Sequence, residues 1–580
     1  MASESVFVIA IDFGTSYSGY CFCLASGTDQ IRQVYWGAEH GLKTPKTPTS
    51  ILFNQKQEFE YFGYDAVMKY KSLPSSQADR WYFFQNFKMQ LYSTNVTAGM
   101  KLKATNGKFL PALTVFSESL RFMKEHALNT IKEASSQTVY DPEEITWVIT
   151  VPAIWSAAAK QFMRLAAKEA GIISGMLSRN LIIALEPEAA SLWCKQLPQE
   201  GFMTDSSDKK KFEDSPGIQY IVVDCGGGTI DITVHEIQEN HCLKELHKAS
   251  GGGWGGNRVD ENFTNFLKEI FSDGVWDEYV KKHPTELQNM MYNFSLQKCS
   301  ASREAVYIRC YYNLTRVAES KKDISKFFEN AVGAVWCDGT IMITYEKMKS
   351  LFDYSVNNII FALREILSKP EMDKVQYILL VGGFACSIIL RDAVRQAFSS
   401  KYHILCPMEA QAAIAKGAVL FGVNPHIITS RISCRTYGLS VCEKFDDAIH
   451  DIRKRRVSKA GDFIYCTGLF QKLVEIGESV NIHKAAHYDF FPIEPDQTKV
   501  TFTFYCTKKQ NAQYVDEEGM EMLGSCEVPS PATWLGLNRR LKVEIQFGLT
   551  EFKATCTDVT SQESRTVIID FLSYNYHSSY

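Results

Sequence analysis

Residues 220–237 read YIVVDCGGGTIDITVHEI. An apolar run ends at Asp224, three glycines and Thr229 follow, and a second acidic residue, Asp231, opens an alternating apolar run. This pattern predicts two strands joined by a tight turn. Glycine in a turn permits positive φ and the close approach of another group to the backbone. The stretch therefore predicts a β-hairpin that carries two carboxylates beside a bare turn.

Residues 7–22, FVIAIDFGTSYSGYCF, repeat this order: an apolar strand, Asp12, a Gly–Thr turn and a second strand. Two such units roughly two hundred residues apart favour an internally duplicated α/β protein with two related lobes. A third apolar run, at residues 377–381, ends in the pair Gly382 and Gly383. A glycine pair at the C-terminal end of a strand that leads into a helix is where open α/β sheets bind ligands.

The chemistry of these turns points to a nucleotide. Backbone N–H groups in a glycine turn can cradle a polyphosphate, but nearby carboxylates would repel it unless a divalent cation stands between them. Magnesium prefers oxygen ligands and binds through few carboxylates plus substrate phosphates. The same carboxylates could position an attacking water. Because Asp and Gly are common turn residues, one copy alone would be a weak signal, and the repetition carries the prediction.

Composition excludes several other classes. At 580 residues the chain is expected to form about three to five domains or subdomains. A net charge of −4 gives no reason to expect nucleic acid or an anionic membrane as a partner. The 16 cysteines contain no CxxC pair, which is typical of reduced, packed thiols in the cytosol.

Charged residues and apolar runs also bear on where the protein is located. No Lys or Arg precedes Arg32 and Asp12 interrupts the first apolar run, so we expect no signal peptide. No uncharged apolar stretch reaches 18 residues, so we expect no membrane span. We therefore expect a cytoplasmic protein. RKRRVS at residues 453–458 leaves a nuclear location or a kinase site open, although a solvated charged run is the simpler interpretation.

Helical periodicity appears between the strands. Phe116, Leu120, Met123, Ala127 and Ile131 recur at steps of three and four, which predicts an amphipathic helix. A second helix is predicted from Ser156, a candidate N-cap, to Gly171, a candidate C-terminal glycine. A third is predicted from the apolar positions between residues 348 and 366. Alternating strands and helices favour mainly parallel sheets flanked by helices.

The domain organisation follows from changes in pattern. Residues 199–217 are polar and mixed in charge, which predicts an exposed connection. After residue 422, apolar and polar residues alternate, as at residues 500–506 and 541–547, which predicts a β-rich region. We expect lobe I at residues 1–198, lobe II at 199–425 including that connection, and a β-rich C-terminal domain at 426–580.

These residues also carry a family resemblance. VIAIDFGTSYS resembles the first phosphate loop of the actin and 70 kDa heat-shock-protein ATPase superfamily, IVVDCGGGTIDITV its second, and the segment around Gly382 its adenosine loop. ITVPAIWSAAAKQFMRLAAKEAGI, LEPEAASLW and GGGWGGNRVDENF are similar to further segments of the heat-shock branch. The likeness runs in order from about residue 6 to residue 425. Within the branch, the chain resembles most the atypical heat shock 70 kDa protein 12A/12B group, up to its final residues.

The resemblance implies a duplicated, actin-like (ribonuclease H-like) ATPase fold and Mg-ATP or Mg-ADP as cofactor. By this likeness, Asp12 and Asp224 would hold magnesium through water, while Lys88, Glu186, Asp231 and Thr229 would have catalytic roles. Pro152 matches a proline implicated in signalling between domains, and Lys160 stands where the family usually carries Arg. The nucleotide-binding residues implied are Gly14, Thr15, Ser16, Gly226, Gly227, Gly228, Thr229, Gly255, Gly256, Lys298, Gly382 and Gly383.

The chain departs from the family around adenosine. After Gly383 the family has Ser-Thr-Arg, whose arginine stacks on adenine, and this chain has Phe384-Ala385-Cys386. Where the family has an acidic residue near the following helix, this chain has Gln411. Lys298 is the one candidate for a residue that would contact adenosine from the other lobe. The family's short aliphatic-acidic linker is absent from residues 424–438. The resemblance therefore implies that the phosphate and metal contacts are kept, and we expect the wall of the adenine site to differ from the family's.

Three functions follow as hypotheses. The first is a weak Mg-dependent ATPase that acts as a divergent heat-shock chaperone in the stress response or as a nucleotide switch, with ATP and protein clients or signalling proteins as partners. The second is a scaffold or interaction protein that binds nucleotide with little or no hydrolysis. The third, a small-molecule kinase of the same fold, would need an acid beside a sugar or acetate pocket, and the sequence contains the heat-shock EPEAA segment instead.

Overall fold

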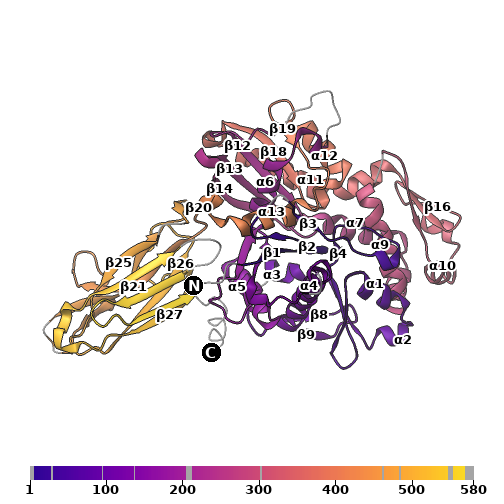
Figure 1. The fold of residues 1–580 in the computed structure, drawn as a ribbon. Helices are drawn as coiled ribbons and strands as arrows, with labels where there is room; N and C mark the ends of the chain where they lie inside the picture. Colours follow the sequence, from indigo (N-terminus) through magenta and orange to yellow (C-terminus); the bar gives the residue numbers. More distant parts are fainter. Residues whose placement is uncertain are drawn as a thin grey trace.

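The computed structural model describes residues 5–27, 30–93, 96–135, 138–203, 212–300, 303–459, 461, 463–482, 485–546 and 553–568. Among them, two mixed sheets form the centre of the molecule (Figure 1). The first sheet has the order β11-β10-β1-β2-β3, with β4 also on β2. Its strands are β1 (Phe7–Phe13), β2 (Tyr17–Leu24), β3 (Arg32–Gln33), β4 (Thr47–Pro48), β10 (Ile145–Val151) and β11 (Leu181–Leu185).

The second sheet has the order β19-β18-β12-β13-β14-β20-β24. Its strands are β12 (Gln219–Cys225), β13 (Ile230–Ile237), β14 (Leu243–Gly252), β18 (Val375–Val381), β19 (His403–Leu405), β20 (Ile428–Ile432) and β24 (Ser479–Asn481). In both sheets the strand whose next-to-last residue is acidic has a parallel neighbour on one side and its hairpin partner on the other. The prediction of mainly parallel sheets is wrong, because the two hairpins and the strands beyond them make both sheets mixed.

Two helices lie between these sheets (Figure 1). They are α6 (Glu186–Gln196), which follows β11, and α13 (Ala413–Val423). Their core contains Val8 and Val148 of the first sheet together with Val222 and Leu379 of the second. A Cβ at Gly417 would lie 1.6 Å from the carbonyl oxygen of Ala189. Only glycine therefore allows α13 to approach α6 this closely.

The predicted helices are present. The apolar face predicted from Phe116 to Ile131 is buried in α4 (Ala112–Ala134). Ser156 caps α5 (Ala157–Glu169) by accepting the N–H of Ala159, and Gly171 follows with φ 71°. The helix predicted around residues 348–366 is α11 (Tyr345–Leu367). These three predictions are confirmed, because capping and helical periodicity are local properties of the sequence.

Smaller elements surround the two sheets. The other helices are α1 (Gly63–Ser72), α2 (Ser75–Ala78), α3 (Gln90–Ser93), α7 (Gly256–Ile270), α8 (Val275–Lys282), α9 (Pro284–Ser300), α10 (Tyr312–Glu319) and α12 (Ile388–Phe398). The other strands before residue 428 are β5 (Ser50–Phe53), β6 (Phe59–Phe62), β7 (Tyr82–Gln85), β8 (Lys101–Lys103), β9 (Phe109–Pro111), β15 (Val306–Arg309), β16 (Ala334–Cys337) and β17 (Thr340–Ile343).

Beyond β20 the described chain forms antiparallel strands, drawn in orange and yellow in Figure 1. One sheet contains β21 (Thr436–Lys444), β22 (Arg455–Val457), β23 (Ile464–Val474), β26 (Lys499–Thr507) and β27 (Met520–Pro529). The other contains β25 (Ala486–Phe490), β28 (Leu541–Gln546), β29 (Lys553–Asp558) and β30 (Ser564–Ile568). The alternation predicted at residues 500–506 and 541–546 is confirmed, while Phe547 lies outside the described residues.

The segment 199–217 differs from its prediction. Phe202 and Phe212 are each 1% exposed, and the Phe212 ring packs edge-on against Tyr220 and Tyr377. The prediction of an exposed connection is therefore wrong at these two residues, which attach the segment to the second sheet. Residues 204–211 lie outside the described part of the chain.

Two further sequence expectations concern the whole chain. All 16 cysteines lie within the described residues and are free thiols. None of the described helices combines the length and the apolar character needed to span a bilayer. Ser458, at the end of the basic run, is 6% exposed, so a kinase could reach its hydroxyl only after a local change in structure.

Candidate functional site

Four buried carboxylates surround the point where the two hairpins meet. Asp12 and Asp224 are the next-to-last residues of β1 and β12, Asp231 is the second residue of β13, and Glu186 opens α6. Each is less than 8% exposed. Strand ends and a helix start deliver these side chains to one place because the sheets face each other across α6 and α13.

The charges of these groups act on one another. Burial raises the pKa of Asp224 well above its usual range, and the charges of Glu186, Asp231 and Asp12 raise it further. Burial also raises the pKa of Glu186, to about 7, against the lowering effect of Lys88. Like charges held in a dry site disfavour ionisation in this way. The mutual effect places the carboxylates of both hairpins in a single cluster.

Two buried lysines neutralise part of this charge. Lys88, in the 3₁₀ turn Phe87–Met89, places its Nζ 2.7 Å from Glu186 Oε1. Lys46 places its Nζ 2.6 Å from Asp12 Oδ2, while Asp12 Oδ1 accepts a hydrogen bond from Thr150 Oγ1 at 3.3 Å. The two acidic residues next to the first sheet are thus each paired with a cation.

Asp224 and Asp231 have no such partner. Asp231 Oδ1 accepts the backbone N–H of Ile154 at 2.9 Å. Asp231 Oδ2 and Asp224 Oδ1 are buried without a hydrogen-bond partner among the described residues. A buried carboxylate oxygen without a partner is costly, and oxygen atoms of this kind suit magnesium or its bound waters. The residues present therefore fit a magnesium ion.

The glycine turns are packed so closely that side chains would not fit. A Cβ at Gly227 would lie 2.2 Å from Ser16 Oγ, and one at Gly228 would lie 2.7 Å from Thr15 Oγ1. The two turns therefore touch across the space between the sheets. Ser16 Oγ also donates to Asn257 Oδ1 at 2.8 Å, which links the first turn to the start of α7.

The other predicted glycines line the same region. The N–H groups of Gly255 and Gly256 donate to the carbonyls of Gly228 and Gly226. Gly382 has φ 87°, and a Cβ there would lie 2.5 Å from Asp224 Oδ1. A glycine is thus required at Gly382 both by its left-handed backbone and by the carboxylate beside it.

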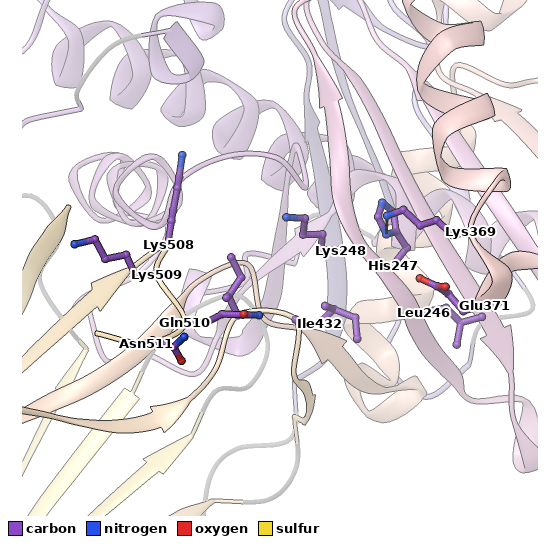
Figure 2. A pocket seen from close by; sticks show the side chains of 12 residues that line it. Leu246, His247, Lys248, Lys369, Glu371, Ile432, Lys508, Lys509, Gln510 and Asn511 are labelled. Carbon is purple, nitrogen blue, oxygen red and sulfur yellow. Dashed lines mark hydrogen bonds between the residues drawn. The ribbon is translucent and has the colours of Figure 1, made fainter. Parts of the chain in front are cut away.

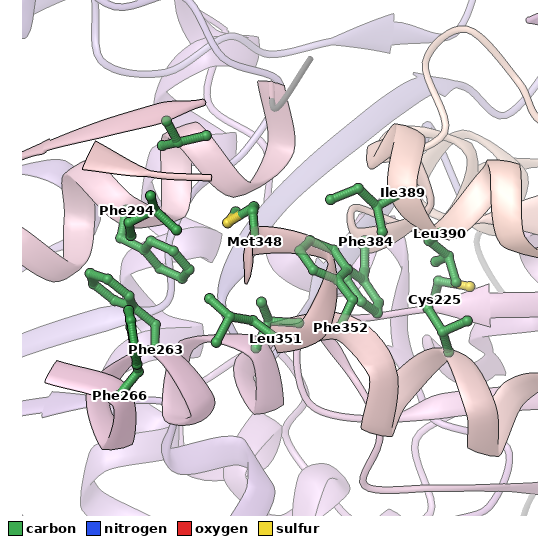
Figure 3. Packing of buried hydrophobic residues seen from close by; sticks show 14 of the residues in the cluster. Cys225, Phe263, Phe266, Phe294, Met348, Leu351, Phe352, Phe384, Ile389 and Leu390 are labelled. Atoms are coloured by element: carbon green, nitrogen blue, oxygen red, sulfur yellow. The ribbon is translucent and has the colours of Figure 1, made fainter. Parts of the chain in front are cut away.

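Part of the segment predicted to face adenosine packs into an apolar core (Figure 3). Phe384 is 5% exposed, and its ring stacks on Phe352 with centroids 5.7 Å apart. Lys298 Nζ contacts the carbonyl oxygen of Gly256 at 2.9 Å and both carboxylate oxygens of Asp260 at 2.8 Å. Phe384 therefore belongs to the apolar core of α7, α11 and α12, and the Lys298 ammonium already has a carboxylate partner.

Comparison with known proteins identifies the family of the chain. Residues 77–424 match the family model described as Hsp70 protein. The chain belongs to the Hsp70 family. It is 34% identical to heat shock 70 kDa protein 12A of Mus musculus over 98% of this chain and 92% of that protein. It is 32% identical to the Homo sapiens 12A protein over the same shares, and 34% identical to the Homo sapiens 12B protein over 99% of this chain and 92% of that one.

Membership of the Hsp70 family implies an actin-like ATPase fold. Most of the site residues predicted from the sequence lie around the carboxylate cluster or contact residues that do. They are Lys88, Glu186 and the predicted residues within 12–16, 224–231, 255–256 and 382–383. Lys298 reaches this region only through Gly256. Sequence reasoning missed Lys46 and Asn257. Lys46 stands in KTPKTPTS, a Pro-rich, polar segment that contains no sign of its buried partner.

A second buried charged cluster lies where β20 joins the second sheet. Arg431 Nη2 is 2.6 Å from Glu188 Oε2, and Glu245 Oε2 accepts the N–H of Ile432 at 2.8 Å. Burial raises the pKa of Glu245 to about 8, and the charge of Glu188 adds to this rise. Lys160 lies half-buried near this cluster, and desolvation lowers its pKa. Glu188 and Glu186 both belong to the first turn of α6, so the start of one helix contributes to both clusters.

A cavity of about 760 Å³ opens on the other side of this junction (Figure 2). Its lining includes His247, Lys248 and Lys369 from the second-sheet side and residues 508–511 from the loop after β26. Of the predicted site residues, none lines it. The carboxylate cluster, and not this cavity, is therefore the candidate functional site.

Proposed function

We propose that this Hsp70-family chain binds a magnesium nucleotide between its two glycine turns and hydrolyses ATP slowly. We further infer a duplicated domain whose lobes are residues 1–198 and 199–425, with the β-rich residues 426–580 as a C-terminal domain that responds to the nucleotide. The observation that carries the proposal is that Asp224 and Asp231 each have a buried carboxylate oxygen without a hydrogen-bond partner in the described part of the chain, beside turns that only glycine fits.

The proposed roles follow from chemistry and position. Asp12 and Asp224 would hold magnesium through water, and the ion would neutralise the charge of the phosphates. Lys88 would contact the terminal phosphate, Glu186 and Asp231 would orient the attacking water, and Thr229 would lie beside the transferred group. The glycine turns would offer their backbone to the phosphates.

Nucleotide entry would require the two turns to move apart. The hydrogen bond from Ser16 to Asn257 and the contacts of Gly227 and Gly228 now join them. Separation and closure of the lobes would be the two-state element that a nucleotide biases. We propose a cytoplasmic, divergent chaperone or nucleotide-dependent switch, with protein clients or signalling proteins as partners.

Calorimetry with ATP, ADP and GTP, each with and without magnesium, tests the binding proposal. We expect binding that strengthens with magnesium and weakens in the Asp224→Ala variant. Loss of a charge-assisted contact corresponds to about 1.5–3 kcal/mol. Release of phosphate from ATP by the wild-type chain, measured against the same variant, then tests hydrolysis. Unchanged affinity in Asp224→Ala would reject the assignment.

A scaffold that uses nucleotide only as a structural ligand is the second candidate. It is favoured by the burial of Phe384 where Hsp70 relatives carry their adenine-stacking arginine. Thermal melting separates the two candidates from a chain that binds no nucleotide. A ligand at 100 times its Kd stabilises by about 2.7 kcal/mol. A shift without phosphate release would favour the scaffold.

A further inference from the structure

We propose that Lys46 is a resident cation of the phosphate site, so that this chain binds a nucleoside diphosphate even without magnesium. The Lys46 ammonium would supply a positive charge beside Asp12 that is present with or without magnesium. This inference rests on the proposed function and states how the same site recognises its anion.

The backbone around Lys46 is attached to the first glycine turn. The N–H of Thr49 donates to the carbonyl oxygen of Ser16 at 2.8 Å, and Thr49 Oγ1 donates to the carbonyl oxygen of Gly14 at 2.8 Å. β4, which starts one residue after Lys46, pairs with β2. The lysine is therefore held beside the turn that would contact the phosphates.

The ammonium is buried among acidic groups. Lys46 is 8% exposed, and its Nζ lies 2.6 Å from Asp12 Oδ2. An ion pair of this length, in a site that excludes most water, is a strong interaction.

The carboxylate oxygens on the two sides of the cluster have different surroundings. Asp12 Oδ2 has no hydrogen-bond partner among the described residues, but its charge is balanced by the Lys46 ammonium at 2.6 Å, and Asp12 Oδ1 accepts a hydrogen bond from Thr150 Oγ1. Asp224 and Asp231 each keep an oxygen without a partner among the described residues. The carboxylates of the second sheet thus have no cation beside them until a metal ion binds, whereas the carboxylate of the first sheet already has one. Lysine is a recognised phosphate-binding point charge.

The experiment is calorimetry of the full chain with ADP, in magnesium and in EDTA. We expect ADP to bind wild type in EDTA with an affinity within about tenfold of its magnesium value. Lys46→Met should lose at least about tenfold in EDTA and less in magnesium, while Lys46→Arg should keep the EDTA binding. Lys43→Met, an exposed lysine of the same segment, is the matched control and should behave as wild type.

The outcomes are distinct. Wild type that binds ADP in magnesium but shows no binding in EDTA would overturn the inference, as would equal affinities of Lys46→Met and Lys43→Met. Absence of ADP binding under both conditions would reject the proposed function, and the inference with it. If Lys46→Met does not fold, the double variant Asp12→Asn/Lys46→Met removes both buried charges and is measured against Asp12→Asn alone under the same criteria.

Discussion

Asp224 on β12 lies directly opposite Asp231 on β13 in the hairpin register. The two carboxylates therefore approach each other in a site that excludes most water. Each keeps a buried oxygen without a partner among the described residues. Two carboxylates held this close repel each other, which does not stabilise the fold. Together they favour the binding of a cation.

The first prediction is that Asp224→Asn stabilises the nucleotide-free chain. Burial and the charges of Glu186, Asp231 and Asp12 oppose ionisation of Asp224, so the amide removes repulsion and should raise the free energy of unfolding by about 1 kcal/mol. The same change should abolish the magnesium-dependent part of nucleotide stabilisation. Thermal melting with and without Mg-ADP measures both effects. The exposed Asp353→Asn is the control, and a lower melting temperature for nucleotide-free Asp224→Asn contradicts the prediction.

The second prediction compares two neighbouring glycines. Gly382→Ala places a Cβ 2.5 Å from Asp224 Oδ1 at φ 87° and should cost about 1–3 kcal/mol of stability. Gly383→Ala has no atom within 4 Å of the new Cβ, and its backbone is helical. That variant should stay within about 0.5 kcal/mol of wild type. Denaturant titration measures the difference, and equal losses would show that the cradle at Gly382 is not tight.

The third prediction concerns the ion pair of Lys88 with Glu186. Both side chains are buried, so removal of one partner leaves the other uncompensated and should cost about 3–5 kcal/mol. Lys88→Met and Glu186→Gln should each be destabilising, and the double variant should cost less than the sum of the two. A double-mutant cycle from thermal or denaturant melts measures this coupling. Additive losses would mean that the two groups act independently.

The fourth prediction is a pH dependence from Glu245. Its pKa of about 8 in the folded chain exceeds its ordinary 4.5, so between these values the folded state holds a proton that the unfolded state has lost. Stability from this group is complete below pH 4.5 and falls as pH rises through 8. Glu245→Gln keeps an acceptor for the N–H of Ile432 and should flatten the fall of the melting temperature across this window.

The groups that face Glu245 set the size of that effect. Glu188 raises its pKa, whereas Arg431 and Lys160 lower it. The exposed Glu443→Gln, which leaves this cluster unchanged, is the control. An identical pH profile for Glu245→Gln and Glu443→Gln would contradict the prediction.

The fifth prediction is weak discrimination between bases. Phe384 stacks in the core on Phe352, and Lys298 is engaged by Gly256 and Asp260. With both groups committed elsewhere, binding energy should come mainly from the phosphates, and the affinities for Mg-ATP and Mg-GTP should agree within about tenfold. Competition titration measures the ratio. A preference for ATP of about a hundredfold or more would show that another part of the site reads adenine.

Local patterns were sufficient to predict much of the fold. The hairpins at Asp12 and Asp224, the capped helix after Ser156 and the alternating strands near the C-terminus follow from spacing and turn chemistry, which depend on neighbouring residues only. The mixed character of the sheets and the burial of Phe202 and Phe212 were not predictable in this way, because they depend on which distant strands become neighbours.

By itself, the sequence determined that two acid-and-glycine hairpins exist, and its order of motifs indicated the family. Only the tertiary structure decided which partner each charged side chain contacts. Lys46 reaches Asp12, and Arg431 reaches Glu188 across 243 positions of the chain. Such pairs are possible only because the sheets and the helices between them bring remote side chains into one dry space. There the Coulomb interaction is strong and every charge needs a partner.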